Sequence, residues 1–264
     1  MTTMTLPVEK RTATWRTFLL IGVIGGVLSG AFGVGGGLIM VPLLITFAGM
    51  DQRRAAAASL VAIIPTSIAG ALAYLVNGEV DVPVALVVAI GGVSGSYLGA
   101  RLLRRLPMTW LRWMFIVLLV GAAARMLFVA PERGAVVGFT VVGVAGLVAA
   151  GLFMGVASGL FGVGGGVVLV PLLIAVFGAG DLVSKGTALL VMLPTAAMGT
   201  LTNMRGGIVD LRAGVTVGIA ATLASFGGVA IAFLMTPRTS GMLFALLLLV
   251  SATQLTVRAL RARS

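Results

Sequence analysis

Long runs of apolar residues cover most of this chain, and short polar stretches separate them. The runs include residues 55–76, 82–100, 113–130, 135–161, 213–235 and 241–257. Several contain about 20 residues, and at about 1.5 Å per residue a helix of that length crosses a hydrocarbon core of about 30 Å. The pattern therefore predicts an all-α integral membrane protein that crosses the bilayer several times.

The sequence also repeats itself at a spacing of 129 residues. The segment "SGAFGVGGGLIMVPLLI" at 29–45 returns as "SGLFGVGGGVVLVPLLI" at 158–174, with 13 of 17 positions identical. The same offset aligns Pro65-Thr66 with Pro194-Thr195 and Asp81 with Asp210. One register maintained over most of the chain predicts two homologous halves, 1–132 and 133–264.

Each half divides into five apolar segments, which in the first half are 17–31, 38–48, 55–76, 82–103 and 109–129. The last three are long enough to cross the bilayer singly. The first two are short, and glycines lie between them, so we expect the chain to break there and form a hairpin. The pattern leaves open whether this hairpin is re-entrant or consists of two short spans.

The positive charges indicate how the segments are oriented, because cytoplasmic loops carry an excess of Lys and Arg. With a hairpin in each half, one side of the membrane receives most of the basic residues and the other receives Arg133, Lys185 and Arg238. The larger group is Lys10, Arg11, Arg16, Arg53, Arg54, Arg101, Arg104, Arg105, Arg112, Arg205, Arg212, Arg258, Arg261 and Arg263. This places both termini in the cytoplasm and inserts the second half upside down, the inverted-repeat architecture of secondary transporters.

The two glycine clusters are the strongest candidates for a binding site. Backbone groups freed by a helix break in lipid must face protein or a water-filled cavity. Two breaks related by a pseudo-two-fold axis would meet near the midplane, where helix N-termini and unpaired amides attract anions. The candidate residues are Gly33, Gly35, Gly36, Gly37, Gly162, Gly164, Gly165 and Gly166. The alternative is that these glycines only permit close helix packing.

A second candidate lining lies on the third segment of each half. Ser59, Thr66 and Tyr74 share one helical face, and Thr195 and Asn203 share the equivalent face. Ser59, Thr66, Thr195 and Asn203 are therefore added to the candidate site, with ordinary interhelical hydrogen bonding as the alternative. Asp81 and Asp210 precede the fourth segment of each half, and we expect both to cap helices.

Composition excludes several classes of function. The chain has no cysteine and no histidine, so thiolate chemistry, the commonest metal ligand and the usual general base are missing. We expect all seven acidic residues to lie in loops or tails, which argues against a cation carrier with an intramembrane carboxylate. The net charge of +11 lies in short loops between apolar runs and does not indicate nucleic-acid binding. We expect no cofactor and no enzymatic activity.

The doubled "SGxFGVGGGxxxVPLLI" motif, the following Pro-Thr pair and the later "VD" resemble the TauE/SafE sulfite exporter family. This resemblance implies a permease of the bacterial cytoplasmic membrane that exports sulfur-containing anions such as sulfite, sulfoacetate or sulfolactate. It carries over the eight glycines of the two clusters as substrate-binding residues.

We therefore expect a secondary transporter with a small anion as substrate and the lipid bilayer as its surroundings. An anion channel of the same fold and a non-transporting membrane scaffold remain alternatives. The sequence leaves open the exact substrate, the direction, the coupling ion and whether the chain forms a homodimer.

Overall fold

The structure, a computed structural model, describes residues 14–128 and 141–261, and ten helices account for most of them. In the first half they are α1 (Trp15–Phe32), α2 (Gly37–Phe47), α3 (Gln52–Val76), α4 (Val82–Arg105) and α5 (Met108–Phe128). In the second half they are α6 (Val141–Phe161), α7 (Gly166–Ala175), α8 (Asp181–Arg205), α9 (Leu211–Leu234) and α10 (Pro237–Arg261). Every segment expected from the sequence corresponds to one helix. The largest extension beyond the expected bounds is at the start of α6.

Length and composition allow seven of the described helices to cross a membrane, namely α1, α3, α4, α6, α8, α9 and α10. Helices α2 and α7 are apolar but contain only 11 and 10 residues. At about 1.5 Å per residue, they reach only about halfway across a hydrocarbon core. The expected hairpin in each half is therefore a long helix followed by a half-length one.

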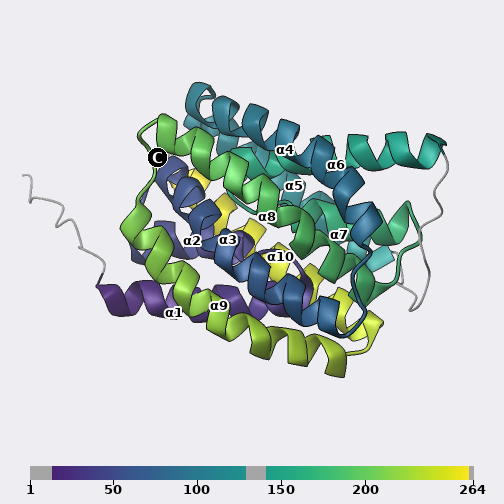
Figure 1. Cartoon of the computed structure of the whole chain (residues 1–264). Helices are drawn as coiled ribbons and strands as arrows, with labels where there is room; N and C mark the ends of the chain where they lie inside the picture. The colour runs from purple at the N-terminus through teal and green to yellow at the C-terminus, as the bar shows by residue number, and fades with distance from the viewer. Residues whose placement is uncertain (1–13, 129–140, 262–264) are drawn as a thin grey trace, which may run out of the picture.

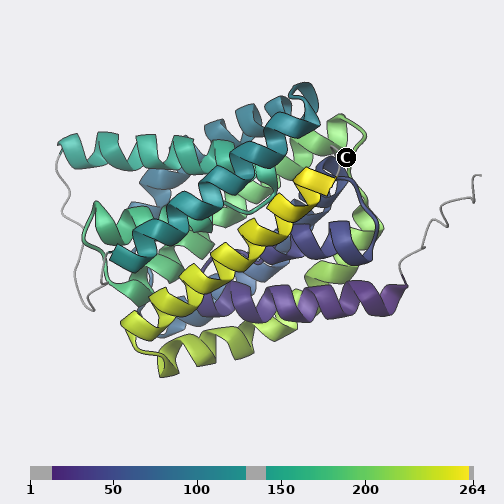
Figure 2. The ribbon, with the colours of Figure 1, turned by 180° about the vertical axis from the view of Figure 1, so that it is seen from behind.

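Helices α3 and α8 pack against each other at the centre of the molecule (Figure 1). Their side chains Leu60, Ile63, Leu189 and Met192 have no exposed surface. Helix α1 packs along α9 on one flank, and α4 packs along α6 on the other. Helices α5 and α10 lie side by side across one face, which is turned toward the viewer in Figure 2. The glycine breaks thus lie inside a shell of longer helices.

The packing pairs recur at the 129-residue offset. The contact of α1 with α9 has its counterpart in that of α6 with α4, and the contact of α3 with α9 has its counterpart in that of α8 with α4. The most extensive helix–helix contacts therefore join one half to the other. Helices α1 and α6 also begin at opposite ends of the molecule in both views (Figures 1 and 2). The described chain begins and ends at one and the same end.

A second set of glycines explains how closely these helices approach. On α1, a methyl group at Gly22, Gly26 or Gly30 would collide with the backbone of α9. The residues 129 positions later, Gly151, Gly155 and Gly159 on α6, meet the backbone of α4 in the same way. Small residues every four positions form a flat stripe that lets two membrane helices touch through their backbones. Glycines outside the GVGGG clusters therefore carry the packing of these helix pairs, and glycines of the clusters make close backbone contacts as well.

Candidate functional site

The two GVGGG clusters break the chain between a long helix and a short one. In the first break Gly33, Gly35 and Gly36 have φ angles of 68°, 73° and 71°. In the second break the angles at Gly162, Gly164 and Gly165 are 71°, 80° and 87°. Residues with a Cβ rarely adopt this left-handed region, so the consecutive turns require glycine. The expected breaks are present, and α2 and α7 begin at the last glycine of each cluster.

Each break leaves a run of backbone amides without hydrogen bonds to the described part of the chain. In the first, the Gly33 amide donates to the Ser29 carbonyl at 2.8 Å, and the next donor along the described backbone is Ile39, to Gly36 at 3.1 Å. In the second, the corresponding donors are Gly162 and Val168. Neither α2 nor α7 has a side-chain cap at its N-terminus. Unpaired amides at a helix N-terminus form a positive region that favours anions.

The two breaks lie directly against each other. A methyl group on Gly37 would meet the Gly162 carbonyl and would lie 2.9 Å from the Val163 Cα. A methyl group on Gly166 would meet the Gly33 carbonyl and would lie 2.7 Å from the Val34 Cα. All the residues of both breaks are buried. The two breaks are therefore neighbours in the interior and contact each other through Cα atoms and carbonyl groups.

Helices α3 and α8 contribute one central residue each to the walls of this region. The Met192 sulfur would lie 2.6 Å from a methyl group on Gly35 and 3.1 Å from one on Gly164. Ile63, which occupies the equivalent position in the first half, contacts the same two glycines. Both helices contain a proline two residues further along, Pro65 and Pro194. Helices α3 and α8 thus reach the paired breaks, where α2 and α7 begin.

The three predicted hydroxyl residues are buried close to the breaks or along the same helices, and all three bond to backbone carbonyls. The Ser59 Oγ lies 2.6 Å from the Gly162 carbonyl oxygen of the second break. Thr66 donates to the Ala62 carbonyl within α3, and Thr195 donates within α8. In this arrangement only Ser59, of these three, bonds to a break.

Asn203 differs from its counterpart in the first half. That counterpart, Tyr74, donates from its hydroxyl to the Gly30 carbonyl of α1 at 2.9 Å. Asn203 is fully buried, and neither atom of its side-chain amide has a hydrogen-bond partner within the described chain. Thr200, one turn away on α8, and Ser158, one turn before the second break, also have buried hydroxyls without partners there. Ser29, the counterpart of Ser158 before the first break, has a buried hydroxyl without a partner in the described chain as well, so unsatisfied polar groups occur in both halves, although buried polar atoms normally find partners.

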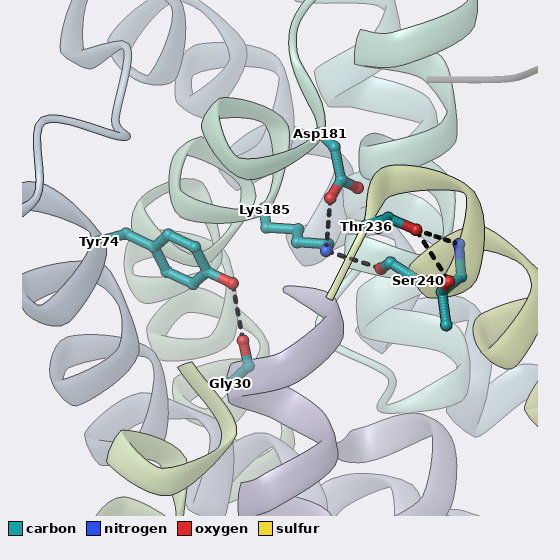
Figure 3. A network of polar contacts seen from close by, with 7 residues as sticks. Gly30, Tyr74, Asp181, Lys185, Thr236 and Ser240 are labelled. Atoms are coloured by element: carbon teal, nitrogen blue, oxygen red, sulfur yellow. Dashed lines mark hydrogen bonds and ion pairs between the residues drawn. The ribbon is translucent and has the colours of Figure 1, made fainter. Parts of the chain in front are cut away.

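The expectation that every acidic residue lies in a loop or tail is wrong for Asp181. This residue is the first of α8, and its side chain is 4% exposed. Lys185, expected near a loop, is buried one turn later, and its ammonium donates to the Asp181 carboxylate at 2.8 Å. The ammonium also donates to the Ser240 hydroxyl of α10 at 2.8 Å (Figure 3). The signal available in the sequence was the i, i+4 spacing of opposite charges, which places them on one helical face.

Three other acidic residues cap helices, and Glu79 lies in the loop between α3 and α4. Asp81 accepts from the Val84 amide at the start of α4, and Asp210 accepts from the Ala213 amide at the start of α9. Both were expected to be N-caps, and both are. Asp51 caps α3 in the same way, by accepting from the amides of Arg53 and Arg54. Glu9 and Glu132 lie outside the described residues.

Two surface hollows are present, and neither is lined by a glycine of the breaks. One of about 680 Å³ lies between α3 and α9, where its apolar lining includes Leu72, Phe226 and Phe233. The other, of about 430 Å³, is lined by apolar side chains of α5 and α6 such as Trp113 and Phe153. Neither lining includes a charged residue, so neither is suited to an anion. Within the described ranges, no group of three or more Asp, Glu, His or Cys residues is placed to hold a metal ion.

Known proteins resemble this chain over most of its length. The sequence model described as sulfite exporter TauE/SafE matches residues 3–126 and 147–264. Two proteins of Bacillus subtilis described as probable membrane transporters, YdhB and YunE, are 27% and 24% identical, each over 73% of this chain and over 80% and 79% of their own lengths. The probable membrane transporter MJ0441 of Methanocaldococcus jannaschii is 39% identical over 106 residues, which span 37% of this chain and 39% of that protein. No solved structure matches the chain significantly.

Proposed function

Since the chain belongs to the sulfite exporter TauE/SafE family of membrane transporters, we propose that it is a secondary transporter that exports small sulfur-containing anions. The family description supports sulfite as a substrate. Organosulfonates such as sulfoacetate and sulfolactate carry the same terminal oxyanion and belong to the same proposal. The chain is a multi-pass helical membrane protein, and the bilayer supplies the barrier across which such anions need a carrier.

The paired breaks are the proposed binding site, and one observation carries this proposal. Two breaks, each with a run of backbone amides without hydrogen bonds to the described chain, are buried in contact with each other. A sulfonate or sulfite oxygen accepts hydrogen bonds from such amides without needing a positively charged side chain. Ser59, Thr66, Thr195 and Asn203 are proposed as further contacts once the breaks separate. Asn203 is the best supported of the four because its amide has no other partner within the described chain.

We further propose that residues 1–132 and 133–264 are inverted repeats and that the site opens alternately to each side. Helices α1 and α6 begin at opposite ends of the molecule, which supports this relation (Figure 1). The recurrence of each packing pair at the 129-residue offset supports it as well. In such transporters the substrate lies at the repeat interface near the midplane, where broken helices meet. The direct contact between the two breaks is then the closed state of the cycle.

The distribution of basic residues supports an orientation with both termini in the cytoplasm, in the cytoplasmic membrane of the cell. Arg53 and Arg54 begin α3, Arg104 and Arg105 end α4, and Arg205 ends α8. With a half-length hairpin in each half, all of these fall on one side. Cytoplasmic loops carry such an excess of positive charge.

Flux measurements with purified protein in liposomes test the proposal. We expect sulfite uptake that saturates with concentration and is accelerated by sulfite on the opposite side. A thermal-shift screen with sulfite, sulfate, thiosulfate, sulfoacetate, taurine and acetate identifies the preferred anion, and we expect sulfite or sulfoacetate to stabilise the protein most. Conductance that does not saturate would identify a channel instead. If these anions produce no flux and do not stabilise the protein, that result would contradict the proposed function.

A further inference from the structure

Asp181 and Lys185 form a buried ion pair beside the first break, and nothing in the proposed transport site so far uses it. The exposed fractions of the two side chains are 4% and 2%. Moving two charges out of water is costly, and a buried pair seldom adds stability compared with apolar residues of similar size. Charged residues inside a membrane protein most often belong to the path of a substrate or ion. The position of this pair relative to the proposed binding site therefore indicates what role it has.

The pair belongs to one half only. The positions 129 residues earlier carry Gln52 and Ala56, at the equivalent turn of α3, and the position equivalent to Ser240 carries Leu111. Gln52 and Ala56 are buried as well. The first turn of α3 carries its charges at other positions, because Asp51 caps the helix and Arg53 and Arg54 follow, and its two buried positions equivalent to Asp181 and Lys185 are uncharged. The fold does not require an ion pair at this turn.

Lys185 is also in contact with the first break. A methyl group on Gly33 would lie 2.6 Å from the Lys185 Cα and 2.7 Å from its Cβ. The Gly33 carbonyl in turn faces Gly166 of the second break. The Lys185 backbone therefore packs directly against the first break, at the residue whose carbonyl contacts Gly166 of the second break.

Three further elements converge on the same point (Figure 3). Tyr74 at the end of α3 holds the Gly30 carbonyl in the last turn of α1, one turn before Gly33. Gly186 lies against the Tyr74 Cβ and the Glu79 carbonyl. Ser240, which accepts from the Lys185 ammonium, lies in the first turns of α10, where the Ser240 amide donates to the Thr236 carbonyl. The ammonium thus lies between α8 and α10, and the backbone of Lys185 and Gly186 lies against the first break and the end of α3.

We propose that Lys185 is the cationic anchor for the transported oxyanion and that the Asp181 carboxylate takes the anion's place when the site is empty. This inference rests on the proposed function. A carboxylate and a sulfite or sulfonate group present the same kind of charged oxygen acceptor to an ammonium. A buried ammonium needs an anionic partner, so Lys185 exchanges one partner for the other as the anion binds and leaves. The anion enters at the amides of the breaks and completes its binding at Lys185.

The variant Asp181→Asn removes the competing charge and keeps the shape of the side chain. We expect it to lower the Kd for sulfite by about fivefold, because a coupling between two competing partners is typically of this size. We expect Lys185→Gln to raise that Kd by about tenfold or more, because it removes a charge-assisted hydrogen bond. Arg238→Gln is the matched control, since Arg238 is an exposed cation on α10 two residues from Ser240. Its sulfite affinity should equal that of the unmodified protein.

Transport kinetics give a second measurement, which a purely structural pair would not affect. Without the Asp181 carboxylate the empty carrier would bury the Lys185 ammonium with one counter-charge fewer, so the empty carrier returns slowly. We expect Asp181→Asn to lower net sulfite efflux by about tenfold, since removing one partner of a buried ion pair is strongly unfavourable. Exchange of sulfite for sulfite needs no empty carrier and should persist.

The outcomes separate this inference from the proposed function. An unmodified protein that carries sulfite, together with an Asp181→Asn variant that binds it more weakly, would overturn the exchange of partners alone. Equal losses of net efflux and exchange in that variant would overturn it too. An unmodified protein that neither binds nor carries sulfite or sulfoacetate would contradict the proposed function itself. If Lys185→Gln does not fold, the Asp181→Asn measurements decide the question.

Discussion

At the scale of a single side chain, the hydroxyl of Ser59 connects α3 to the second break through a hydrogen bond. It lies 2.6 Å from the Gly162 carbonyl oxygen and 2.9 Å from that of Ala56, and its one proton serves the nearer acceptor. The position 129 residues later is Ala188, so the first break has no such bond. A buried carbonyl that loses its donor retains the cost of its desolvation.

We predict that Ser59→Ala lowers the free energy of unfolding by about 1–3 kcal/mol, because it leaves the Gly162 carbonyl unpaired. Thermal unfolding in detergent measures the change. Ser94→Ala is the control, because Ser94 is exposed and bonds to Ile90 within α4. Equal melting temperatures for the two variants would show that the Ser59 bond does not hold the break.

Side-chain chemistry could be predicted from sequence where it is local. Asp81 and Asp210 cap the helices that follow them, since a cap depends only on neighbours along the chain. The burial of Asp181 could not be predicted in this way. It depends on α10, whose Ser240 lies 55 positions from Lys185 and completes the cluster. Distances of that kind are set by the packing of helices that no local pattern specifies.

At the scale of elements, glycine stripes determine which helices touch. Helix α1 contacts the backbone of α9 at Gly22, Gly26 and Gly30. In return, Gly228 of α9 lies against the Val27 carbonyl of α1. Adjacent Gly227 faces open space, because a methyl group there would have no neighbouring atom within 4 Å. The two neighbouring residues therefore separate the effect of packing from the effect of helix propensity.

We predict opposite effects for alanine at these two neighbours. Gly228→Ala forces α1 and α9 apart and should lower the free energy of unfolding by about 1–3 kcal/mol, the usual range for overpacking. Gly227→Ala should leave stability unchanged or raise it by about 1 kcal/mol, because alanine favours helix more than glycine does. Thermal unfolding of both purified variants tests this. A destabilised Gly227→Ala variant would contradict the assignment of the stripe.

Helix positions were largely predictable because an apolar run between polar loops marks a membrane crossing. The predicted segments 38–48 and 82–103, for example, correspond to α2 (Gly37–Phe47) and α4 (Val82–Arg105). The glycine breaks were predictable for the opposite reason, since consecutive glycines disfavour a helix. The sequence did not distinguish the glycine stripes on α1 and α6 from the glycines of the breaks. Glycine permits both a sharp turn and a close helix contact, and only the packed structure shows where each glycine lies.

At the scale of the whole molecule, the halves interlock and do not form separate bodies. Helix α1 packs on α9, and α6 packs on α4, so each half supplies a flank for the other. The repeat itself was visible in the sequence because its register is unbroken over most of the chain. Which helix of one half packs against which helix of the other could not be predicted, because that choice depends on the shapes of the assembled surfaces.

We predict that equivalent loops of the two halves face opposite compartments. The chain has no cysteine, so a single cysteine can report accessibility. Asn77→Cys and Arg205→Cys introduce one at the exposed ends of α3 and α8. In intact cells a membrane-impermeant maleimide should label the first variant, and it should label the second only after the membrane is opened. Labelling of both from the same side would contradict the inverted arrangement.

The confinement of Asp181 and Lys185 to one half has an energetic consequence for the whole cycle. If the two halves carried identical side chains, the states open to either compartment would be degenerate. Charges in one half at the positions where the other carries Gln52 and Ala56 remove that degeneracy. In the proposed cycle the unloaded protein would then favour one compartment even without a membrane potential, and this turn of α8 would contribute to that preference together with other differences such as Ser59 against Ala188.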